Sequence, residues 1–343
     1  MSEIRIRRDG HAGRITLTRP DALHALTLSM CEQMIEAMLA WEDDPGVGVV
    51  MIDHEGGRGF CAGGDIRALI DSLAGDGAYA RQFFFTEYRL DHLIFTYAKP
   101  VITFMDGVVM GGGAGIALAS AQRVATENTV FAMPECGIGL FPDVGAGWSL
   151  SRLPGKTGLW LALTGSRLKA QACGQLGLSN AHVAAADVEA AKAAIAAKPQ
   201  AAETILKAPP GETSELVDRC NRLFGGASVE EIVERLERDA TEWASAQAAA
   251  IKSKCPMMLK VAFRQLAEAA GMTDFADELS MEYGLAIRAI HRADFTEGVR
   301  AVIIDKDQAP RWDPPTLEGV SEPMVDEMFA PLPPGQQWLP LPR

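Results

Sequence analysis

Two stretches near the start of the chain alternate charged and apolar residues. Residues 4–7 and 14–17 do so on either side of the turn residues His11-Ala-Gly13. Alternation with a period of two around a short turn predicts a β-hairpin. Apolar residues at helical spacing over 28–41 predict a helix, and the continuous apolar run 47–52 predicts a strand buried on both faces.

Glycine-rich segments follow two of the predicted strands. Residues 56–64 follow the strand 47–52, and residues 111–120, which begin Gly-Gly-Gly-Ala-Gly, follow a second short strand at 101–105. A helix is predicted over 79–98, and the small residues of 111–120 predict a turn that continues as a helix. Strands, helices and glycine turns therefore alternate, which predicts an α/β arrangement with crossovers.

The second half of the chain is predicted to be mostly helical. The alanine-rich segment 184–202 and the segment 258–270 both have helical patterns, and the latter carries one apolar stripe. The apolar run 301–304 predicts a single strand. Pro209-Pro210-Gly211 predicts a loop, and the proline-rich residues after Pro331 predict a loosely packed tail.

Composition narrows the class of protein. The chain has 343 residues, 48% of them hydrophobic, with a formal net charge of −13. A chain of this length and composition forms a full hydrophobic core, and its acidic balance argues against a nucleic-acid partner. The apolar stretch 107–121 is too short for a membrane helix and holds five glycines, so no membrane association is expected.

The cysteines and the first residues indicate a cytoplasmic location. No C-x-x-C pair or metal-ligand spacing occurs, so we expect reduced thiols and no metal site. Residues 1–10 contain no apolar run after their basic residues and do not form a secretory signal. The six cysteines are Cys31, Cys61, Cys136, Cys173, Cys220 and Cys255.

The two glycine turns are the first candidates for chemistry. If the backbone N–H groups of Gly64 and Gly112 converge, they form an oxyanion hole for a carbonyl, with about 3 kcal/mol of stabilisation from each donor. The alternative is that each glycine serves a turn or close packing. The second turn lacks the Lys-Ser/Thr of a P-loop and does not fit G-x-G-x-x-G, and no G-x-S-x-G motif occurs.

Three carboxylates lie in apolar surroundings. Glu135 and Asp143 are the only acids in residues 131–145, and Glu87 shares a helix face with Phe83 and Leu90. Burial raises a carboxyl pKa toward neutrality, which suits a general acid or base. The alternatives are a turn cap or an ion pair for Glu135 and Asp143, and the edge of the apolar stripe for Glu87.

The order of these motifs resembles that of the crotonase (enoyl-CoA hydratase/isomerase) superfamily, over about residues 4–330. Within it, the chain is most similar to the 3-hydroxyisobutyryl-CoA hydrolase subfamily. The superfamily resemblance rests on residues 16–26, 59–66, 99–107, 110–115 and 131–135, and the subfamily resemblance on residues 137–145, 161–165, 259–266 and 294–307.

The resemblance implies an α/β fold, with a crotonase-like ββα spiral core over 1–205 and a mostly helical region over 206–343. It implies an acyl-CoA thioester as substrate, with no separate cofactor, and a homo-oligomer or a tail folded onto its own core. The implied residues are, for the oxyanion hole, Gly64 and Gly112; for backbone contacts to CoA, Ala62, Gly63, Gly64, Asp65 and Ile66; and for the substrate, Glu87, Gly112, Glu135 and Asp143.

One departure from the superfamily pattern favours hydrolysis over hydration. Enoyl-CoA hydratases carry a glutamate two positions after the Gly-Gly-Gly turn, and this chain has Gly115 there. The resemblance then implies hydrolysis of a short 3-hydroxyacyl-CoA, in the first place 3-hydroxyisobutyryl-CoA of valine degradation, with Glu135 and Asp143 as catalytic residues. Glu135 attacks the thioester or activates water. A hydratase or isomerase and a non-catalytic acyl-CoA binder are the alternatives.

Overall fold

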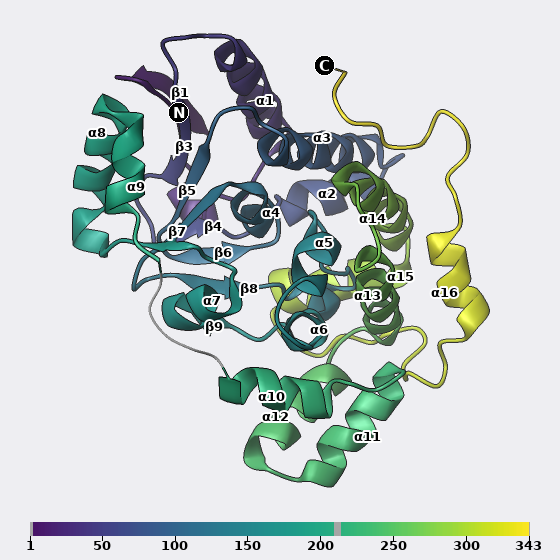
Figure 1. Ribbon diagram of the computed structural model, residues 1–343. Helices are drawn as coiled ribbons and strands as arrows, with labels where there is room; N and C mark the ends of the chain where they lie inside the picture. Colours follow the sequence, from purple (N-terminus) through teal and green to yellow (C-terminus); the bar gives the residue numbers. More distant parts are fainter. Residues whose placement is uncertain (1–2, 209–213, 343) are drawn as a thin grey trace.

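The structure, a computed structural model, describes residues 3–208 and 214–342. Two β-sheets form the centre of the molecule, and helices cover them (Figure 1). The larger sheet has the strand order β1 (Ile4–Asp9), β2 (Ala12–Leu17), β3 (Val49–His54), β5 (Val101–Met105), β7 (Gln122–Ala125) and β10 (Ala181–His182). The smaller sheet has the order β4 (Gly59–Cys61), β6 (Val108–Met110), β8 (Val130–Ala132) and β9 (Leu168–Lys169).

The predicted hairpin and the predicted buried strands are confirmed. β1 and β2 pair antiparallel, and β2, β3, β5 and β7 pair in parallel in that order. All residues of β5 are buried, as are the first five of β3, because helices cover both faces of this sheet. The strands β9 and β10 were not predicted, because two residues are too few to show an alternation of apolar and polar positions.

The chain winds as a spiral in which successive strand pairs add one strand to each sheet. β3 and β4, then β5 and β6, then β7 and β8 follow one another along the chain and alternate between the sheets. As a result, β4, β6 and β8 lie side by side in parallel. Their carboxyl ends meet at one edge of the smaller sheet, which is where ligands bind in such sheets. The ββα spiral core is thus confirmed.

The helices of the first half cover this spiral. α1 begins after Thr27, whose side chain accepts a hydrogen bond from the N–H of Met30, and α3 is the long predicted helix. These helices are α1 (Leu28–Glu42), α2 (Ile66–Leu73), α3 (Ala78–Phe95), α4 (Gly112–Ala119), α5 (Ala146–Ser151), α6 (Thr157–Thr164), α7 (Ala170–Leu176), α8 (Val188–Ala197) and α9 (Ala202–Ile205). Short 3₁₀ turns are η1 (Pro20–Ala22), η2 (Glu135–Ile138), η3 (Ala185–Asp187) and η4 (Pro199–Ala201).

The second half is helical, as predicted, but the strand expected at 301–304 is wrong. Residues Arg300–Ile304 form a π-helix that continues the preceding α-helix. A short apolar run does not distinguish a strand from a helix end. The helices are α10 (Ser214–Leu223), α11 (Val229–Asp239), α12 (Glu242–Lys252), α13 (Pro256–Ala269), α14 (Phe275–Ala289), α15 (Ala293–Val299) and α16 (Glu322–Phe329). The loop predicted at 209–211 lies outside the described residues.

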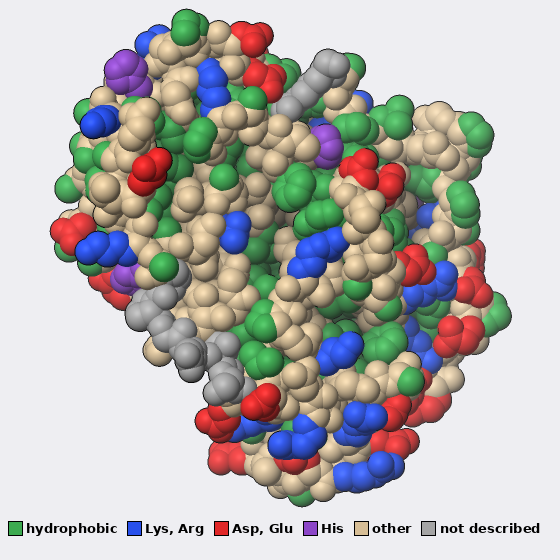
Figure 2. Space-filling view, viewed as in Figure 1, with side chains coloured by type: hydrophobic (Ala, Val, Ile, Leu, Met, Phe, Trp, Pro, Cys, Tyr) green, Lys and Arg blue, Asp and Glu red, His purple; other side chains and the backbone are tan. Residues whose placement is uncertain are grey.

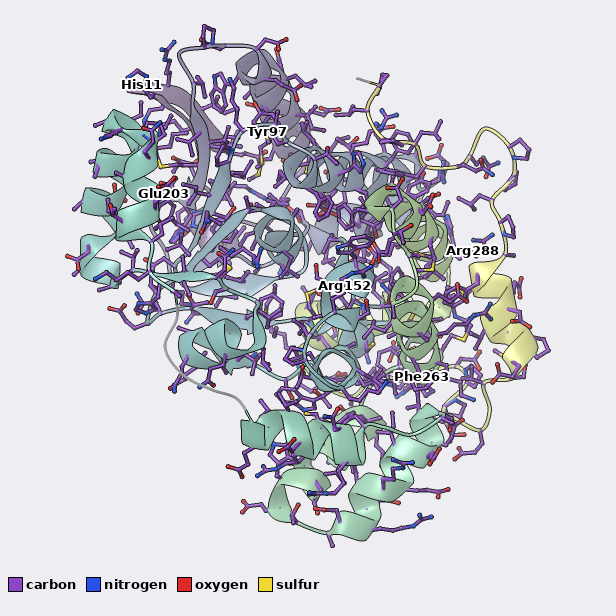
Figure 3. The ribbon with its side chains drawn as sticks, viewed as in Figure 1. His11, Tyr97, Arg152, Glu203, Phe263 and Arg288 are labelled. Atoms are coloured by element: carbon purple, nitrogen blue, oxygen red, sulfur yellow. The ribbon has the colours of Figure 1, made fainter. Side chains whose placement is uncertain are left out.

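The tail after Pro331 is not loose, contrary to the prediction. Trp338 is buried, and its indole N–H donates to the carbonyl oxygen of Phe85 on α3. Arg89 of α3 donates to the carbonyl oxygen of Leu339. Arg288 of α14 donates to the carbonyl oxygens of Met328 and Ala330 at the end of α16 (Figure 3). The Trp338 indole and Arg89 therefore anchor a segment whose proline content alone suggests mobility.

One buried hydrophobic cluster runs through both halves of the chain, from β1 to Trp338. The boundary predicted between 205 and 206 stays a prediction. Charged side chains of both signs cover the end of the molecule formed by α10–α12 (Figure 2), where Arg219, Arg235 and Arg238 pair with glutamates one helical turn away. Within the described residues, no helix combines the length and the apolar character needed to span a bilayer.

A group of paired charges lies beside the larger sheet. The side chains of Arg14, Asp53 and Lys192 are mostly buried, whereas that of Glu189 is 74% exposed. Asp53 of β3 is 1% exposed and forms ion pairs with Arg14 of β2, at 2.6 Å, and with Lys192 of α8, at 2.8 Å. Glu189 of α8 pairs with the same two cations. Burial alone raises the pKa of Asp53, but the charges of Lys192 and Arg14 outweigh it, so the pKa is lowered. We call Arg14, Asp53, Glu189 and Lys192 the flank cluster.

Candidate active site

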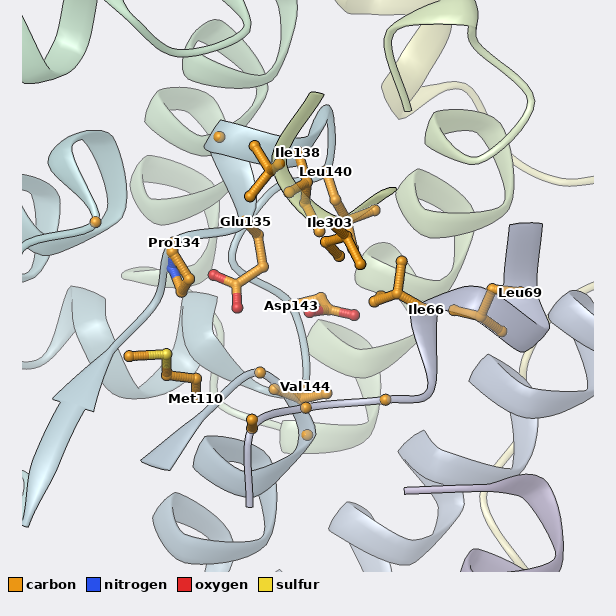
Figure 4. A pocket seen from close by; sticks show the side chains of 18 of the residues that line it. Ile66, Leu69, Met110, Pro134, Glu135, Ile138, Leu140, Asp143, Val144 and Ile303 are labelled. Carbon is orange, nitrogen blue, oxygen red and sulfur yellow. The ribbon is translucent and has the colours of Figure 1, made fainter. Parts of the chain in front are cut away.

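A cavity of about 410 Å³ opens at the edge where the ends of β4, β6 and β8 meet. Its wall includes the turn after β4, the turn after β6 and the residues that follow β8. Ile303 of the π-helix also lines it, so the second half of the chain closes part of the cavity. Figure 4 shows Glu135 and Asp143 with their carboxyl groups turned into the same space.

The backbones of the two glycine turns touch. A Cβ built on Gly111 would lie 3.0 Å from Cα of Gly63, and one built on Gly63 would lie 3.8 Å from the nitrogen of Gly112. Gly63 and Gly111 also have φ of +111° and +49°, which side-chain-bearing residues rarely adopt. Glycine is therefore required at Gly63 and Gly111 both by conformation and by the close approach, as the turn and close-packing alternative expects. The oxyanion hole of Gly64 and Gly112 stays a prediction.

The local pairing orients the N–H of Gly64. Leu26 forms a parallel bridge to Gly64, in which Leu26 donates to the carbonyl of Gly63 and accepts from the N–H of Asp65, both at 2.8 Å. In such a pairing the N–H of the central residue points away from its partner. Gly112 is the first residue of α4, whose leading N–H groups have no acceptor within the helix. The bridge to Leu26 therefore does not use the N–H of Gly64, and the hydrogen bonds within α4 do not use that of Gly112; both residues line the cavity.

Glu87 lies against the second turn. It is 2% exposed, on the cavity side of α3, and a Cβ on Gly112 would collide with its Oε1. Among the described residues this Oε1 has no hydrogen-bond partner. Burial first, and the charges of Asp143 and Asp91 second, raise the pKa of Glu87 well above its usual range. Glu87 therefore belongs to the cavity wall, and the edge-of-stripe alternative is wrong.

Glu135 lies three positions after the end of β8 and begins η2. It is 5% exposed and reaches the glycine turn: its Oε1 lies 3.6 Å from where a Cβ on Gly111 would be. Burial and the charge of Asp143 raise its pKa well above the usual range. The N–H of Gly111 and the ammonium group of Lys254 act in the opposite direction. The position thus holds a carboxyl group that retains its proton more readily than in water.

Asp143 lies in the loop between η2 and α5. The hydroxyl of Tyr88 donates to its Oδ2 at 2.8 Å. Burial and the charge of Glu282 raise the pKa of Asp143 to about 7, and the Tyr88 hydroxyl opposes this. The cap and ion-pair alternatives find no support, because the described partner of Asp143 is a phenol of the neighbouring helix.

The structure brings eight of the nine predicted site residues to the cavity and leaves one outside its lining. Asp65 instead caps α2, accepting from the N–H of Ala68, and pairs with Arg19 at 2.8 Å. The lining residues are Ala62, Gly63, Gly64, Ile66, Glu87, Gly112, Glu135 and Asp143.

Sequence reasoning missed a second layer of acids behind the cavity. Asp91 is fully buried, and neither of its oxygens has a partner among the described residues. Its position four residues after Glu87 was the available signal, as was the spacing of Glu278 and Glu282 on α14. We call the six buried acids the acidic wall: Glu87, Asp91, Glu135, Asp143, Glu278 and Glu282.

Positive groups reach this region at few points. Lys254 and Arg167 line the cavity. Lys254 acts on Glu135, and Arg152, which stacks on Trp148 (Figure 3), acts on Glu278. Within the described residues, no group of three or more His, Cys, Asp or Glu has the geometry to hold a metal ion. All six cysteines are free and buried.

Comparison with known proteins identifies relatives over almost the whole chain. The family model described as enoyl-CoA hydratase/isomerase matches residues 12–329. The protein named "3-hydroxyisobutyryl-CoA hydrolase, mitochondrial" from Gallus gallus is 43% identical over 96% of this chain and 89% of its own. Its namesake from Homo sapiens is 38% identical over 95% of this chain and 88% of its own.

Two solved structures have the same fold throughout. A carnitinyl-CoA dehydratase from Mycobacterium thermoresistibile has a TM-score of 0.93 at 36% identity, covering 97% of this chain and 98% of its own. An enoyl-CoA hydratase from Rhodobacter sphaeroides has a TM-score of 0.93 at 39% identity, covering 98% of this chain and all of its own. This chain belongs to the enoyl-CoA hydratase/isomerase family.

Proposed function

We propose that the protein hydrolyses the thioester of a short 3-hydroxyacyl-CoA, with 3-hydroxyisobutyryl-CoA as the preferred substrate. The products are CoA and the free hydroxy acid, a step that fits valine degradation. The observation that carries the proposal is the cavity itself: two backbone amides from touching glycine turns stand beside two buried carboxyl groups, Glu135 and Asp143. Relatives named as 3-hydroxyisobutyryl-CoA hydrolases support the same reaction.

The amides of Gly64 and Gly112 would form the oxyanion hole. They would donate to the thioester oxygen as it gains negative charge, with about 3 kcal/mol from each donor. Lys254 and Arg167 offer positive charge to the phosphates of CoA. The backbone of residues 62–66 would accept the adenine, although the Asp65 side chain is engaged with Arg19.

Glu135 would act by one of two balanced routes. As a general base, it takes a proton from water while the water oxygen bonds to the carbonyl carbon; the C–S bond then breaks, and the CoA thiolate leaves and is protonated. As a nucleophile, its carboxylate displaces the thiolate to form an anhydride, which water hydrolyses. Asp143 would accept a hydrogen bond from the 3-hydroxyl group of the acyl chain, or it would position the attacking water. Glu87 would contact the substrate. Neither route requires a metal or a redox cofactor.

The decisive variant is Glu135→Gln. It keeps the side-chain shape and removes the base, so thiol release should fall by a factor of about 10²–10⁴. Binding of a non-hydrolysable thioether analogue, measured by calorimetry, should be retained. Glu36→Gln, an exposed glutamate of α1, is the matched control and should turn over normally. Near-normal thiol release by Glu135→Gln would refute the assignment.

Hydration on the same scaffold is the competing function, because the two solved structures above are named as a dehydratase and a hydratase. Position 115 argues against it. A Cβ on Gly115 would lie 2.6 Å from Cβ of Val144 and 3.0 Å from both oxygens of Asp91, so there is no space for a second glutamate. Crotonyl-CoA and 3-hydroxyisobutyryl-CoA separate the two: thiol release marks hydrolysis, and loss of enoyl absorbance without thiol marks hydration.

Binding without turnover is the third reading, and the same panel tests it, since such a protein would release no thiol from any ester. The assembly as a homo-oligomer stays a prediction, to be measured by light scattering. A cytoplasmic location also stays a prediction, whereas the names of the relatives include the word mitochondrial.

A further inference from the structure

The loop that carries Asp143 has an unusual backbone. Residue Val144, next to it, has φ of +58°, and Gly145 has φ of +80°. A β-branched residue in the left-handed region is rare, because its side chain crowds the backbone. Such a conformation persists only where the surroundings determine it more strongly than the local preference does. The loop between η2 and α5 therefore needs support from elsewhere in the chain.

That support comes from α13 and α14, more than 120 positions further along the chain. Glu282 of α14 is fully buried, and its carboxylate accepts from the N–H of Gly145 at 2.7 Å and of Gly147 at 3.0 Å. Gln265 of α13 donates from Nε2 both to Glu282 and to the carbonyl of Pro142, each at 2.7 Å. Hydrogen bonds thus bracket Asp143 and Val144 on both sides.

The support lies within the acidic wall. Burial first, and the charge of Glu278 second, raise the pKa of Glu282 well above its usual range, while the N–H groups of Gly145 and Gly147 oppose this. Glu278, one turn before it, accepts from the N–H of Trp148, and burial raises its pKa to about 7. The titratable groups that face Asp143 are Glu278 and Glu282 from α14, Glu87, Tyr88 and Asp91 from α3, and Glu135 from η2.

We propose that Glu282 is a positioning residue for the hydrolysis: by accepting from the N–H groups of Gly145 and Gly147, it holds the Asp143 loop in its left-handed turn. The inference rests on the proposed function and deepens it. Glu282 is not among the residues that line the cavity. Its contribution is to present Asp143 to the cavity.

Glu282→Gln tests this role. The amide nitrogen replaces one acceptor, so it faces an N–H donor and at least one hydrogen bond to the loop is lost. We expect kcat for thiol release to fall at least about tenfold, with KM within about threefold, because Asp143 is misplaced while the cavity lining is unchanged. Glu282→Asp has a shorter side chain that cannot reach both N–H groups, so its kcat should fall too.

The control is Thr103→Val, which removes a buried hydroxyl that bonds Ser120 away from the cavity. It should lower Tm and leave kcat near the wild-type value; a loss of kcat as large as that of Glu282→Gln would overturn the inference, because general loosening would then explain the loss. If Glu282→Gln does not fold, Gln265→Met removes one bond to the loop, at Pro142, and one to Glu282. It should lower kcat, and a normal kcat would overturn the inference.

The two levels of the proposal fail differently. Wild-type protein that releases no thiol from any ester refutes the proposed hydrolysis. Wild-type protein that releases thiol, together with a Glu282→Gln variant that keeps the wild-type kcat, refutes the role of Glu282 alone.

Discussion

The flank cluster and the acidic wall both bury charge, and they do so in opposite ways. In the flank cluster, Asp53 has two cations within 3 Å, and its pKa is lowered. In the acidic wall, six carboxyl groups lie together, with Lys254 and Arg152 each acting on a single member, and burial raises the pKa of every one. A buried carboxylate that is paired with cations stays ionised and links two elements. Buried carboxyl groups with few cations beside them retain their protons near neutral pH, here beside a cavity.

The largest effect should come from unbalancing the flank cluster. Lys192→Met leaves Asp53 with Arg14 alone, so the free energy of unfolding should fall by about 3 kcal/mol, as measured by urea denaturation. Lys198→Met, an exposed lysine just after the same helix, is the control and should change little. Thiol release per folded molecule should stay normal. A variant of normal stability and reduced turnover would break the comparison.

A smaller effect should come from crowding the acidic wall. Gly115→Ala places a methyl group 2.6 Å from Cβ of Val144, which must shift together with the Asp143 loop. We expect a loss of about 1–3 kcal/mol in unfolding free energy and a lower kcat. Gly271→Ala, where the nearest atom is 3.7 Å away, is the matched control. Wild-type stability and turnover in Gly115→Ala would show that the wall is looser than described.

Near neutral pH, the acidic wall rather than the flank cluster should determine how the free energy of unfolding changes with pH. A carboxyl group whose pKa is raised on folding binds more protons in the folded state, so its contribution is present at low pH and is lost as pH rises through the folded pKa. Because the pKa of Asp53 is lowered, its contribution to stability changes only in acid, below about pH 4. Tm should therefore rise by about 2 °C or more between pH 8 and pH 6. A fall over this interval would contradict the proton assignment of the wall.

The smallest effect should come from Asp91→Asn. The amide mimics the protonated acid and takes up no proton on folding, so the variant should be at least as stable as the wild type, with a difference that is larger at pH 8 than at pH 6. Urea denaturation at the two pH values measures this. Asp71→Asn, an exposed aspartate of α2, should show no such difference. A loss of stability at pH 8 would mean that Asp91 is needed as an anion.

Much of the spiral was predictable because its signals are local. The hairpin alternates with a period of two, β5 is a short apolar run, and glycine marks both turns at the cavity. Glu135 and Asp143 could be named because an acid in an apolar segment is costly unless it has a role. These features need only neighbouring residues to be recognised.

The features that escaped prediction depend on contacts across the chain. The apolar run at 301–304 became a π-helix because it continues α15, and the proline-rich tail is fixed by Trp338 on α3. Asp65 is not part of the cavity lining, because its side chain forms an ion pair with Arg19. The role of Glu282 depends on glycine amides 135 and 137 positions away, which no local pattern reveals.

The distance in sequence between Asp143 and its support has a consequence for biosynthesis. Both glycine turns and Glu135 leave the ribosome long before Gln265 and Glu282 do, and domains form from the N-terminus during synthesis. The nascent spiral therefore carries its amides and one acid while the loop with the other acid still lacks its hydrogen bonds. We expect turnover to begin only after α14 has emerged and docked, so that no unfinished chain consumes acyl-CoA.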